Sequence, residues 1–261
     1  MARREELSDE QWAIIEPLIP PLPRRQDGRG RPWRDNHEVL NGILWILRSG
    51  ARWKDLPERF PPYQTCHRRF QQWVRDGVLK SVLEALAEDL RTRGELELSE
   101  CFIDGTFIVA KKGGRCVGKT KRGKGTKLMA VADGSSIPVS VHAASASPHE
   151  VTLVRETLDQ SFTDERPEHL IGDKAYDSDP LDKELAKQGV EMIAPHRDDR
   201  TKAPTQDGRA LRRYRRRWKV ERLFAWLQNY RRLIIRHEYH VENFVGFVYL
   251  PCILILLKSY L

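Results

Sequence analysis

The feature that most constrains the fold of this chain is a strand-like run with a charge at its centre. Residues 98–109 read LSECFIDGTFIV, and a β-branched and aromatic run of this kind is typical of a buried strand. Asp104 stands inside it, although aspartate disfavours strands. A buried carboxylate must be paired, hydrogen-bonded or bound to a metal. The sequence therefore predicts a sheet around this strand and a special environment for Asp104.

The segments after this strand predict a mixed sheet covered by helices. Ser147 and Pro148 are expected to begin the first of these helices, as its N-cap and first residue. The hairpin connection 133–136 is expected to join two of the strands. The full set comprises strands at 127–132, 137–144, 170–172 and 190–194 and helices at 147–158, 179–188 and 209–230. This order of elements is typical of an α/β fold.

The first part of the chain has a different pattern and predicts a bundle of short helices. Ser8 and Gln11 form a capping box that begins a helix. Asp35 is placed to begin a second helix, which Gly50 ends. Two more helices are expected at 63–75 and 79–90. We therefore divide the chain into a small helical domain over residues 1–95 and an α/β domain over residues 96–261.

The helix at 63–75 gives the N-terminal domain a candidate DNA-reading face. Phe70 and Trp73 are expected to point inward. The polar side chains are expected to point outward, namely those of Arg68, Arg69, Gln71, Gln72 and Arg75. Short capped helices with an Arg/Gln face resemble a helix-turn-helix module, although any small helical bundle would show a similar pattern.

The charge of the chain is concentrated in two basic blocks. The formal net charge is +8. Residues 111–127 hold eight lysines and arginines and no acidic residue, and five glycines there indicate a flexible loop. Residues 209–236 hold eleven basic residues and a single acid, Glu221. Two blocks with charge of a single sign indicate a binding surface for a polyanion. The alternative is an ordinary basic surface.

Several other classes of protein are excluded by composition. The four cysteines are far apart and form no CxxC pair, which argues against a disulfide framework and fits a reducing cytosol. The first residues lack the apolar stretch of a signal peptide. The apolar run at 244–257 carries Pro251 and is shorter than the about 18 residues of a membrane span. We expect a cytoplasmic protein with no membrane contact, in which this run forms a buried helix.

Two further carboxylates, those of Asp173 and Glu221, also stand where the local sequence gives a charge an unusual setting. Asp173 directly follows the short strand at 170–172, and strand ends of open α/β sheets are where ligands collect. Glu221 shares a helical face with Trp218 and Phe224. Hard divalent cations prefer such oxygen ligands, and a pair of them can drive phosphodiester chemistry. The alternatives are a satisfied buried group at Asp104, a turn cap at Asp173 and an ion pair between Glu221 and the arginine one turn before it.

At these residues the chain resembles a known family. The motifs are FIDGTFI around Asp104, LIGDKAYDSD around Asp173, and Tyr214-x-x-Arg217-x-x-x-Glu221. They resemble the DDE transposases of bacterial insertion sequences, in the related families four and five. The N-terminal segments LSDEQWAIIEPLIPP and HRRFQQWVRDGV and the tail segment WKVERLFAWLQNYRRL resemble the family-five enzymes. The resemblance covers nearly the whole chain in the expected order.

The resemblance implies a ribonuclease-H-like mixed sheet with flanking helices and a metal-binding catalytic triad of Asp104, Asp173 and Glu221. It implies two divalent metal ions, Mg²⁺ with Mn²⁺ as a substitute. The implied activity is binding of terminal inverted repeats, cleavage to 3′-hydroxyl ends and their joining to target DNA. The alternatives are an inactive, domesticated DNA-binding relative and a nuclease without strand transfer. Gln228 stands where family four carries a lysine, so a lysine–phosphate contact is not expected there.

The DNA contacts expected from the sequence come from three segments. The partner is double-stranded DNA, as terminal repeats and as target, and the protein is expected to act at the nucleoid. Because transposition holds two ends together, we expect a homodimer or larger assembly on DNA. Two apolar features could supply its interface, namely the tryptophans Trp12, Trp33 and Trp53 and the C-terminal segment. The expected contacts are Arg68, Arg69 and Gln72; Lys119, Lys121, Arg122 and Lys124; and Tyr214, Arg217, Lys219 and Arg222.

Overall fold

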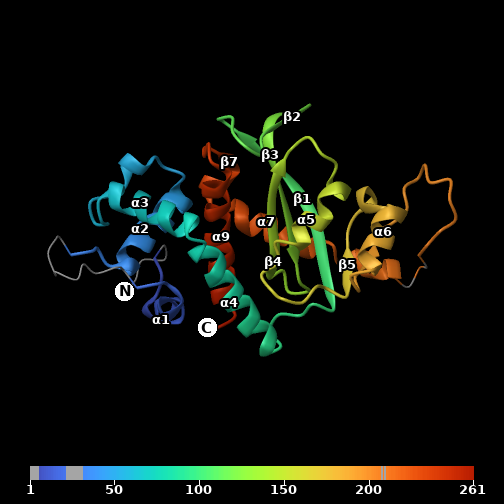
Figure 1. The fold of residues 1–261 in the computed structure, drawn as a ribbon, viewed down its shortest axis with the longest axis horizontal. Helices are drawn as coiled ribbons and strands as arrows, with labels where there is room; N and C mark the ends of the chain where they lie inside the picture. The colour runs from blue at the N-terminus through green and yellow to red at the C-terminus, as the bar shows by residue number, and fades with distance from the viewer. Residues whose placement is uncertain (1–5, 22–31, 207, 209) are drawn as a thin grey trace.

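The computed structural model describes residues 6–21, 32–206, 208 and 210–261, and its centre is a mixed sheet (Figure 1). Strands follow the order β2-β3-β1-β5-β6, while β4 pairs with β3 and β7 with β1. The strands are β1 (Glu100–Ala110), β2 (Gly118–Thr120), β3 (Gly123–Ala132), β4 (Pro138–Ser145), β5 (His169–Ile171), β6 (Glu191–Ile193) and β7 (Ile235–Arg236). The five expected strands are confirmed, and β2 and β7 were not predicted.

The sheet has an opening along one edge of β1. On one side, β3 pairs with β1 antiparallel from Phe102 to Val109. On the other side, β5 pairs with β1 only as far as Phe102, and β7 pairs with it only from Val109 onward. In the described part of the chain, the edge of β1 between these two points therefore has no strand partner. Asp104 lies in this opening.

The N-terminal helices begin and end where local sequence rules place them. Ser8 and Gln11 form the expected capping box, Asp35 accepts a hydrogen bond from the amide of Glu38, and Gly50 ends the second helix in the left-handed conformation. The helices are α1 (Asp9–Ile15), α2 (Asn36–Ser49), α3 (Tyr63–Arg75) and α4 (Val78–Thr92), with 3-10 turns η1 (Glu16–Leu18) and η2 (Trp53–Asp55). The expected helices are thus confirmed.

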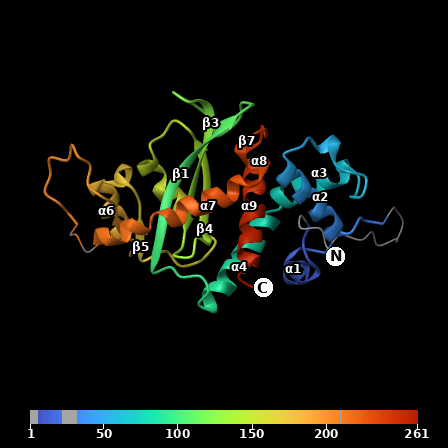
Figure 2. The ribbon, with the colours of Figure 1, turned by 180° about the vertical axis from the view of Figure 1, so that it is seen from behind.

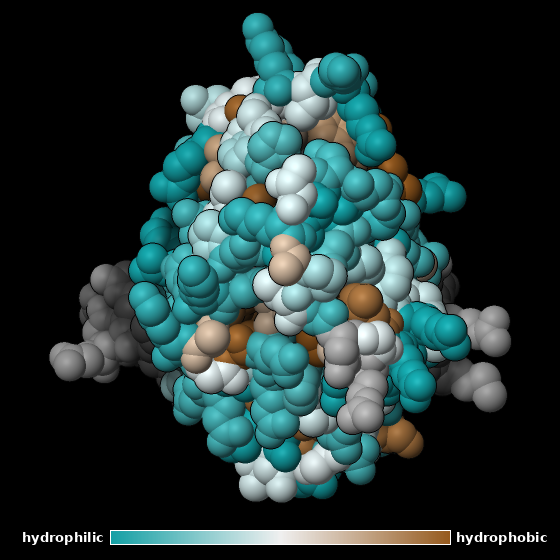
Figure 3. Space-filling view, turned by 90° about the vertical axis from the view of Figure 1, so that its right-hand side faces the viewer, coloured by the Kyte–Doolittle hydropathy of each residue, from teal (hydrophilic) through white to brown (hydrophobic). Residues whose placement is uncertain are grey.

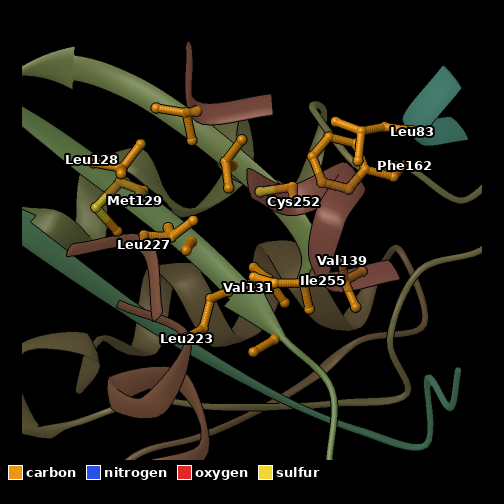
Figure 4. Packing of buried hydrophobic residues seen from close by; sticks show 14 of the residues in the cluster. Leu83, Leu128, Met129, Val131, Val139, Phe162, Leu223, Leu227, Cys252 and Ile255 are labelled. Atoms are coloured by element: carbon orange, nitrogen blue, oxygen red, sulfur yellow. The ribbon is translucent and has the colours of Figure 1, made fainter. Parts of the chain in front are cut away.

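The C-terminal helix α9 (Val241–Leu257) joins the N-terminal helices to the sheet. In Figures 1 and 2 it stands between α2 and α3 on one side and β4 on the other, and α4 runs across it. Figure 4 shows Cys252 and Ile255 of α9 in one cluster with Leu83 of α4 and Val131 of the sheet. The expectation of a buried packing helix is confirmed. No described helix is long and apolar enough to cross a membrane.

This packing covers most of the apolar surface that was considered for an oligomer interface. The ring of Trp53 lies 6.0 Å from that of Phe247 in α9, and Trp12 stacks on His37 at 4.7 Å. Trp33 remains exposed. The end of the molecule at α6 (Asp179–Ala186) is mainly hydrophilic, with apolar residues scattered singly (Figure 3). The apolar surfaces of α9 and Trp53 are therefore already covered by packing within the chain.

Two expected helices differ from the sequence prediction. The segment 147–158 forms a 3-10 turn, η3 (Glu150–Leu153), and then α5 (Val154–Leu158). Ser147 is not its cap, because the Ser147 hydroxyl donates instead to the carbonyl of Lys119. The expected helix at 209–230 is divided into η5 (Ala210–Arg216) and α7 (Trp218–Gln228), followed by α8 (Arg231–Ile234). In Figure 2, α7 crosses the face of β1.

Candidate active site

Asp104 is a half-buried carboxylate, with 18% of its side chain exposed, and it accepts two hydrogen bonds. Its Oδ1 accepts from the amide of Gly105 at 2.8 Å, and its Oδ2 accepts from Nη1 of Arg217 at 3.0 Å. Burial raises the pKa of Asp104 to about 6, while the Gly105 amide and the Arg217 charge act against the rise. Glu150 and Asp173 raise it further because they are like charges nearby. Asp104 thus has like charges near it, which the bonded Arg217 partly offsets.

Glu221 is brought to Asp104 by the same arginine. Nη2 of Arg217 lies 2.6 Å from Oε1 of Glu221, one helical turn away. One guanidinium therefore bridges carboxylates from β1 and α7. The expectation that Glu221 shares its helical face with aromatic residues instead of solvent is only partly right, because Phe224 is buried but Trp218 is 42% exposed and the Glu221 side chain is itself exposed. The reason is that the regular helix begins only at Trp218, so its side chain projects beyond the packed turns.

Asp173 reaches the opening from the end of β5. This strand ends at Ile171, which pairs with Phe102, two residues before Asp104. The side chain of Asp173 accepts from the amide of Ala175 at 2.8 Å and caps the 3-10 turn η4 (Lys174–Tyr176). Its charge contributes to the pKa shifts of both Asp104 and Arg217. The structure therefore brings the three sequence-predicted carboxylates to one region, with Asp173 also acting as a turn cap.

The donor set at this opening suits a hard divalent cation. In the described residues, no three His, Cys, Asp or Glu side chains are grouped as a ready metal site. The nearby ligand atoms are carboxylate oxygens, which Mg²⁺ and Mn²⁺ prefer. Two of these carboxylates already share one cation, the guanidinium of Arg217. Asp104 and Glu221 are therefore positioned to face a common positive charge, and the residues present fit the implied metal.

The basic segment before Glu221 is partly occupied by internal contacts. Arg213 donates to Glu100 at 2.7 Å, and Arg216 pairs with the same carboxylate. Tyr214 lies near Arg217, with the guanidinium carbon 5.9 Å from the ring centre.

The next two basic residues lie beside an exposed ring. Lys219 Nζ is 4.3 Å and the Arg222 guanidinium carbon 4.2 Å from the centre of the Trp218 ring. Of the predicted DNA contacts of this segment, Arg222 is therefore exposed, while Tyr214, Arg217 and Lys219 are half-buried.

The second basic block forms a β-hairpin instead of the flexible loop expected from its glycines. Strands β2 and β3 pair from Gly118–Gly125 to Thr120–Gly123, and the hairpin projects beyond the sheet in Figure 1. A Cβ on Gly125 would lie 2.2 Å from the Phe107 ring, so this glycine allows close packing. The four predicted DNA-contact residues are exposed on this hairpin, namely Lys119, Lys121, Arg122 and Lys124.

The polar face of α3 is less exposed than expected. Arg68 is exposed and Gln72 is half-buried, but Arg69 is 3% exposed. The Arg69 guanidinium pairs with the side chain of Asn36 and lies 5.9 Å from the Trp73 ring centre. The expectation that Arg69 points outward is wrong, because α2 packs against α3 on that side.

Three residues that the sequence did not single out lie beside these carboxylates, namely Lys127, Glu150 and Tyr176. Tyr176 donates its hydroxyl to Oε2 of Glu150 at 3.1 Å, and Lys127 Nζ lies 3.6 Å from Oε1 of the same residue. The available signal is weak, because Glu150 lies in the segment expected to begin a helix, where an acidic residue is ordinary. Tyr176 lies inside the motif around Asp173 but carries no charge.

The architecture defines the class of protein. Over 91% of this chain and 68% of the other chain, the fold is similar to that of piggyBac transposase in a synaptic complex with hairpin DNA, with a TM-score of 0.55 and 11% identity. The chain has a ribonuclease-H-like mixed sheet preceded by a helical N-terminal region.

The sequence comparisons then identify the family. Residues 7–83 match the family "Putative transposase of IS4/5 family", and residues 95–257 match "Transposase DDE domain". The chain belongs to the DDE transposase family of bacterial insertion sequences.

Two relatives from Burkholderia cepacia agree with this assignment. The IS402 uncharacterized 16.2 kDa protein is 38% identical over 44% of this chain and 80% of its own length. The putative transposase for IS402 is 30% identical over 50% of this chain and 62% of its own length. As a DDE transposase, the protein is an enzyme of DNA cleavage and strand transfer, and its family generally depends on divalent metal.

Proposed function

We propose that this transposase binds the terminal inverted repeats of its own insertion sequence, cleaves there to 3′-hydroxyl ends and joins these ends to target DNA. The observation that carries the proposal is the convergence of Asp104, Asp173 and Glu221 at the opening beside β1. Exposed basic side chains are present on the β2–β3 hairpin and, at Arg222, on the same helix as Glu221.

In this proposal Asp104, Asp173 and Glu221 hold two Mg²⁺ or Mn²⁺ ions. When bound, these ions activate the attacking oxygen and stabilise the leaving oxygen of a phosphodiester. Arg217 releases at least one of its two carboxylates and becomes available to the DNA backbone. In the hydrolytic step, the water oxygen bonds to phosphorus, the bond to the 3′ oxygen breaks and that oxygen is protonated. In the joining step, this 3′ oxygen displaces a 3′ oxygen of the target.

The remaining cations position DNA along the site. Phosphate contacts orient the duplex without reading its sequence. We assign this role to Lys119, Lys121, Arg122 and Lys124 on the hairpin and to Tyr214, Arg217, Lys219 and Arg222 near Glu221. Sequence reading falls to the helical region 1–95, through Arg68 and Gln72 on α3. Arg69 holds α3 against α2 in this scheme.

The proposal extends to assembly and location. Two element ends must be held together, and each chain carries one site, so the working form on DNA is a homodimer or larger. A protein that acts on bacterial DNA works at the nucleoid, where we place this transposase.

The experiment that tests the function measures cleavage and joining on a terminal-repeat duplex with Mg²⁺. We expect Asp104→Asn, Asp173→Asn and Glu221→Gln each to abolish both reactions while the affinity for the duplex changes little, because binding relies on cations elsewhere. Glu184→Gln is the matched control, since Glu184 lies on α6 and pairs with Arg155 at 3.6 Å. Full cleavage by any triad variant would remove that residue from the site. Cleavage by the wild type without joining would identify a nuclease.

A further inference from the structure

Glu150 approaches Asp104 from the reverse face of the sheet. Side chains alternate along a strand, so Asp104 faces Arg217 while Gly105 faces η3, which begins at Glu150. A Cβ at position 105 would lie 2.9 Å from Cδ of Glu150 and 2.8 Å from Sδ of Met129. Only glycine therefore allows the Glu150 carboxylate to lie this close to the backbone that follows Asp104.

Both oxygens of Glu150 are engaged by other residues of the chain. Oε2 accepts from the Tyr176 hydroxyl at 3.1 Å. Oε1 lies 3.6 Å from Nζ of Lys127, which also donates to the carbonyl of Pro148 at 2.7 Å. Glu150 is therefore held by one side chain from β3 and one from η4.

Tyr176 connects Glu150 to the second aspartate. A Cβ at Gly172, the residue before Asp173, would lie 2.6 Å from Cδ2 of the Tyr176 ring. The amide of Tyr176 donates to the carbonyl of Asp173 at 3.0 Å. The ring is 0% exposed, so it has no freedom to move away. Glu150 thus contacts the backbone after Asp104 and, through Tyr176, the backbone on both sides of Asp173.

We propose that Glu150 is a positioning residue that, with Tyr176, sets the separation of Asp104 and Asp173 for metal binding. The inference rests on the proposed function of these aspartates. Glu150 acts through its contacts and is not a ligand, because Lys127 and Tyr176 occupy its two oxygens and it lies on the other face of β1. A rigid link of this kind is effective because displacement of reacting groups by about 1 Å can cost about 100-fold in rate.

The test is a double-mutant cycle on the full-length protein, with Glu150→Ala, Tyr176→Phe and the double variant. We expect each single variant to lower the cleavage rate about 10- to 100-fold, and the double variant to be no slower than the slower single one. Glu150→Gln should recover much of the loss, since its amide oxygen still accepts from Tyr176. Affinity for terminal-repeat DNA should not change. Tyr260→Phe, which removes a hydroxyl that bonds to Leu86 and Asp89 far from the site, is the matched control.

A second readout is Mn²⁺ binding, followed by electron paramagnetic resonance without DNA. The expected result is weaker Mn²⁺ binding in Glu150→Ala and Tyr176→Phe, restored in Glu150→Gln. Unchanged Mn²⁺ affinity, or losses in rate that multiply in the double variant, would overturn the proposal. Loss of Mn²⁺ in Glu150→Gln as complete as in Asp104→Asn would make Glu150 a ligand and also overturn it. A wild type that binds Mn²⁺ but does not cleave would contradict the proposed function, while the Mn²⁺ comparison would still decide the role of Glu150.

Discussion

Asp104 shows at the scale of one residue how a site can reduce the stability of its own fold. Its carboxylate is half-buried and partly desolvated, and the charges of Glu150 and Asp173 lie nearby, so its pKa rises to about 6 from an ordinary value of 3.8. Arg217 offsets only part of this. Strongly perturbed groups of this kind are concentrated at functional sites, and their strain is tolerated because the function requires it.

This environment predicts a gain in stability when the charge is removed. The folded-state pKa is higher than the unfolded one, so the stability that protonated Asp104 contributes is complete below about pH 4 and is lost as the pH rises through about 6. At about pH 7.5, Asp104→Asn should therefore stabilise the metal-free protein by about 1–3 kcal/mol. Arg217 keeps Glu221 as its partner in the variant.

Urea unfolding of the wild type and the variant in the presence of a chelator measures the difference. The gain should decrease as the pH is lowered from about 7.5 toward about 4. Glu184→Gln on α6 serves as the control and should show no such pH dependence. A gain that is the same at both ends of this pH range would show that the Asp104 carboxylate is not strained by its surroundings.

The hairpin β2–β3 shows at the scale of one element how a basic block is displayed. Its base is anchored by the fully buried Arg236, which donates to the Thr126 hydroxyl at 2.6 Å and to the carbonyl of Arg115 at 2.9 Å. The basic side chains near the turn are exposed. Lys127 belongs to the same sequence block, but its ammonium group pairs with the carboxylate of Glu150. In the proposed function, the charge of this block is divided between DNA binding at the turn and the contact of Lys127 with Glu150.

Neutralising the turn of the hairpin should weaken binding to every duplex alike. For Lys119→Gln, Lys121→Gln and Arg122→Gln, each lost phosphate contact should reduce the log–log salt dependence of the binding constant by about 0.9. Fluorescence anisotropy with terminal-repeat and random duplexes measures both slopes. Lys187→Gln, at the end of α6, is the control. A loss confined to the terminal repeat would instead mean that the hairpin reads sequence.

The whole molecule is held together by α9, which packs on α4 and on the sheet. Buried residues of the N-terminal helices, the sheet and α9 belong to one continuous hydrophobic cluster. The pairing of Phe70 with Phe247, whose ring centres are 4.3 Å apart, belongs to this contact. Removal of residues 1–95 would expose α9, so point substitutions are better suited than truncation to test the N-terminal region.

We therefore expect the N-terminal helices and the sheet to unfold in one transition. Phe247→Ala should lower the free energy of unfolding by about 3–5 kcal/mol. It should lower the unfolding midpoint of the N-terminal helices and that of the sheet equally. Circular dichroism reports the helices, and hydrogen exchange of β1 and β3 amides reports the sheet. Separate midpoints in the wild type would show that α9 does not couple the two parts.

Much of the secondary structure could be predicted because it follows from local rules. The capping box at Ser8, the cap at Asp35 and the stop at Gly50 act within one helical turn, and α3 has the predicted bounds. Strand β1 was evident because its composition is strongly biased. Asp104 and Glu221 could be singled out because each is a charge in an unsuitable local setting, which is visible without knowledge of its neighbours in space.

Other features were decided only by contacts between distant parts of the chain. The inward position of Arg69 depends on Asn36 of α2, and the break before Trp218 occurs where Arg213 and Arg216 reach back to Glu100 in β1. Strand β7 exists only because β1 offers it an edge.

The same holds for the link from Glu150 through Tyr176 to Asp173. It joins residues that are ordinary in their own sequence neighbourhoods. Local sequence determines which segments become helices and strands and which charges are misplaced, since propensity and capping act over a few residues. Tertiary structure alone decides which of those charges share an arginine and which glycines permit close approach, because both depend on the distance between atoms far apart along the chain.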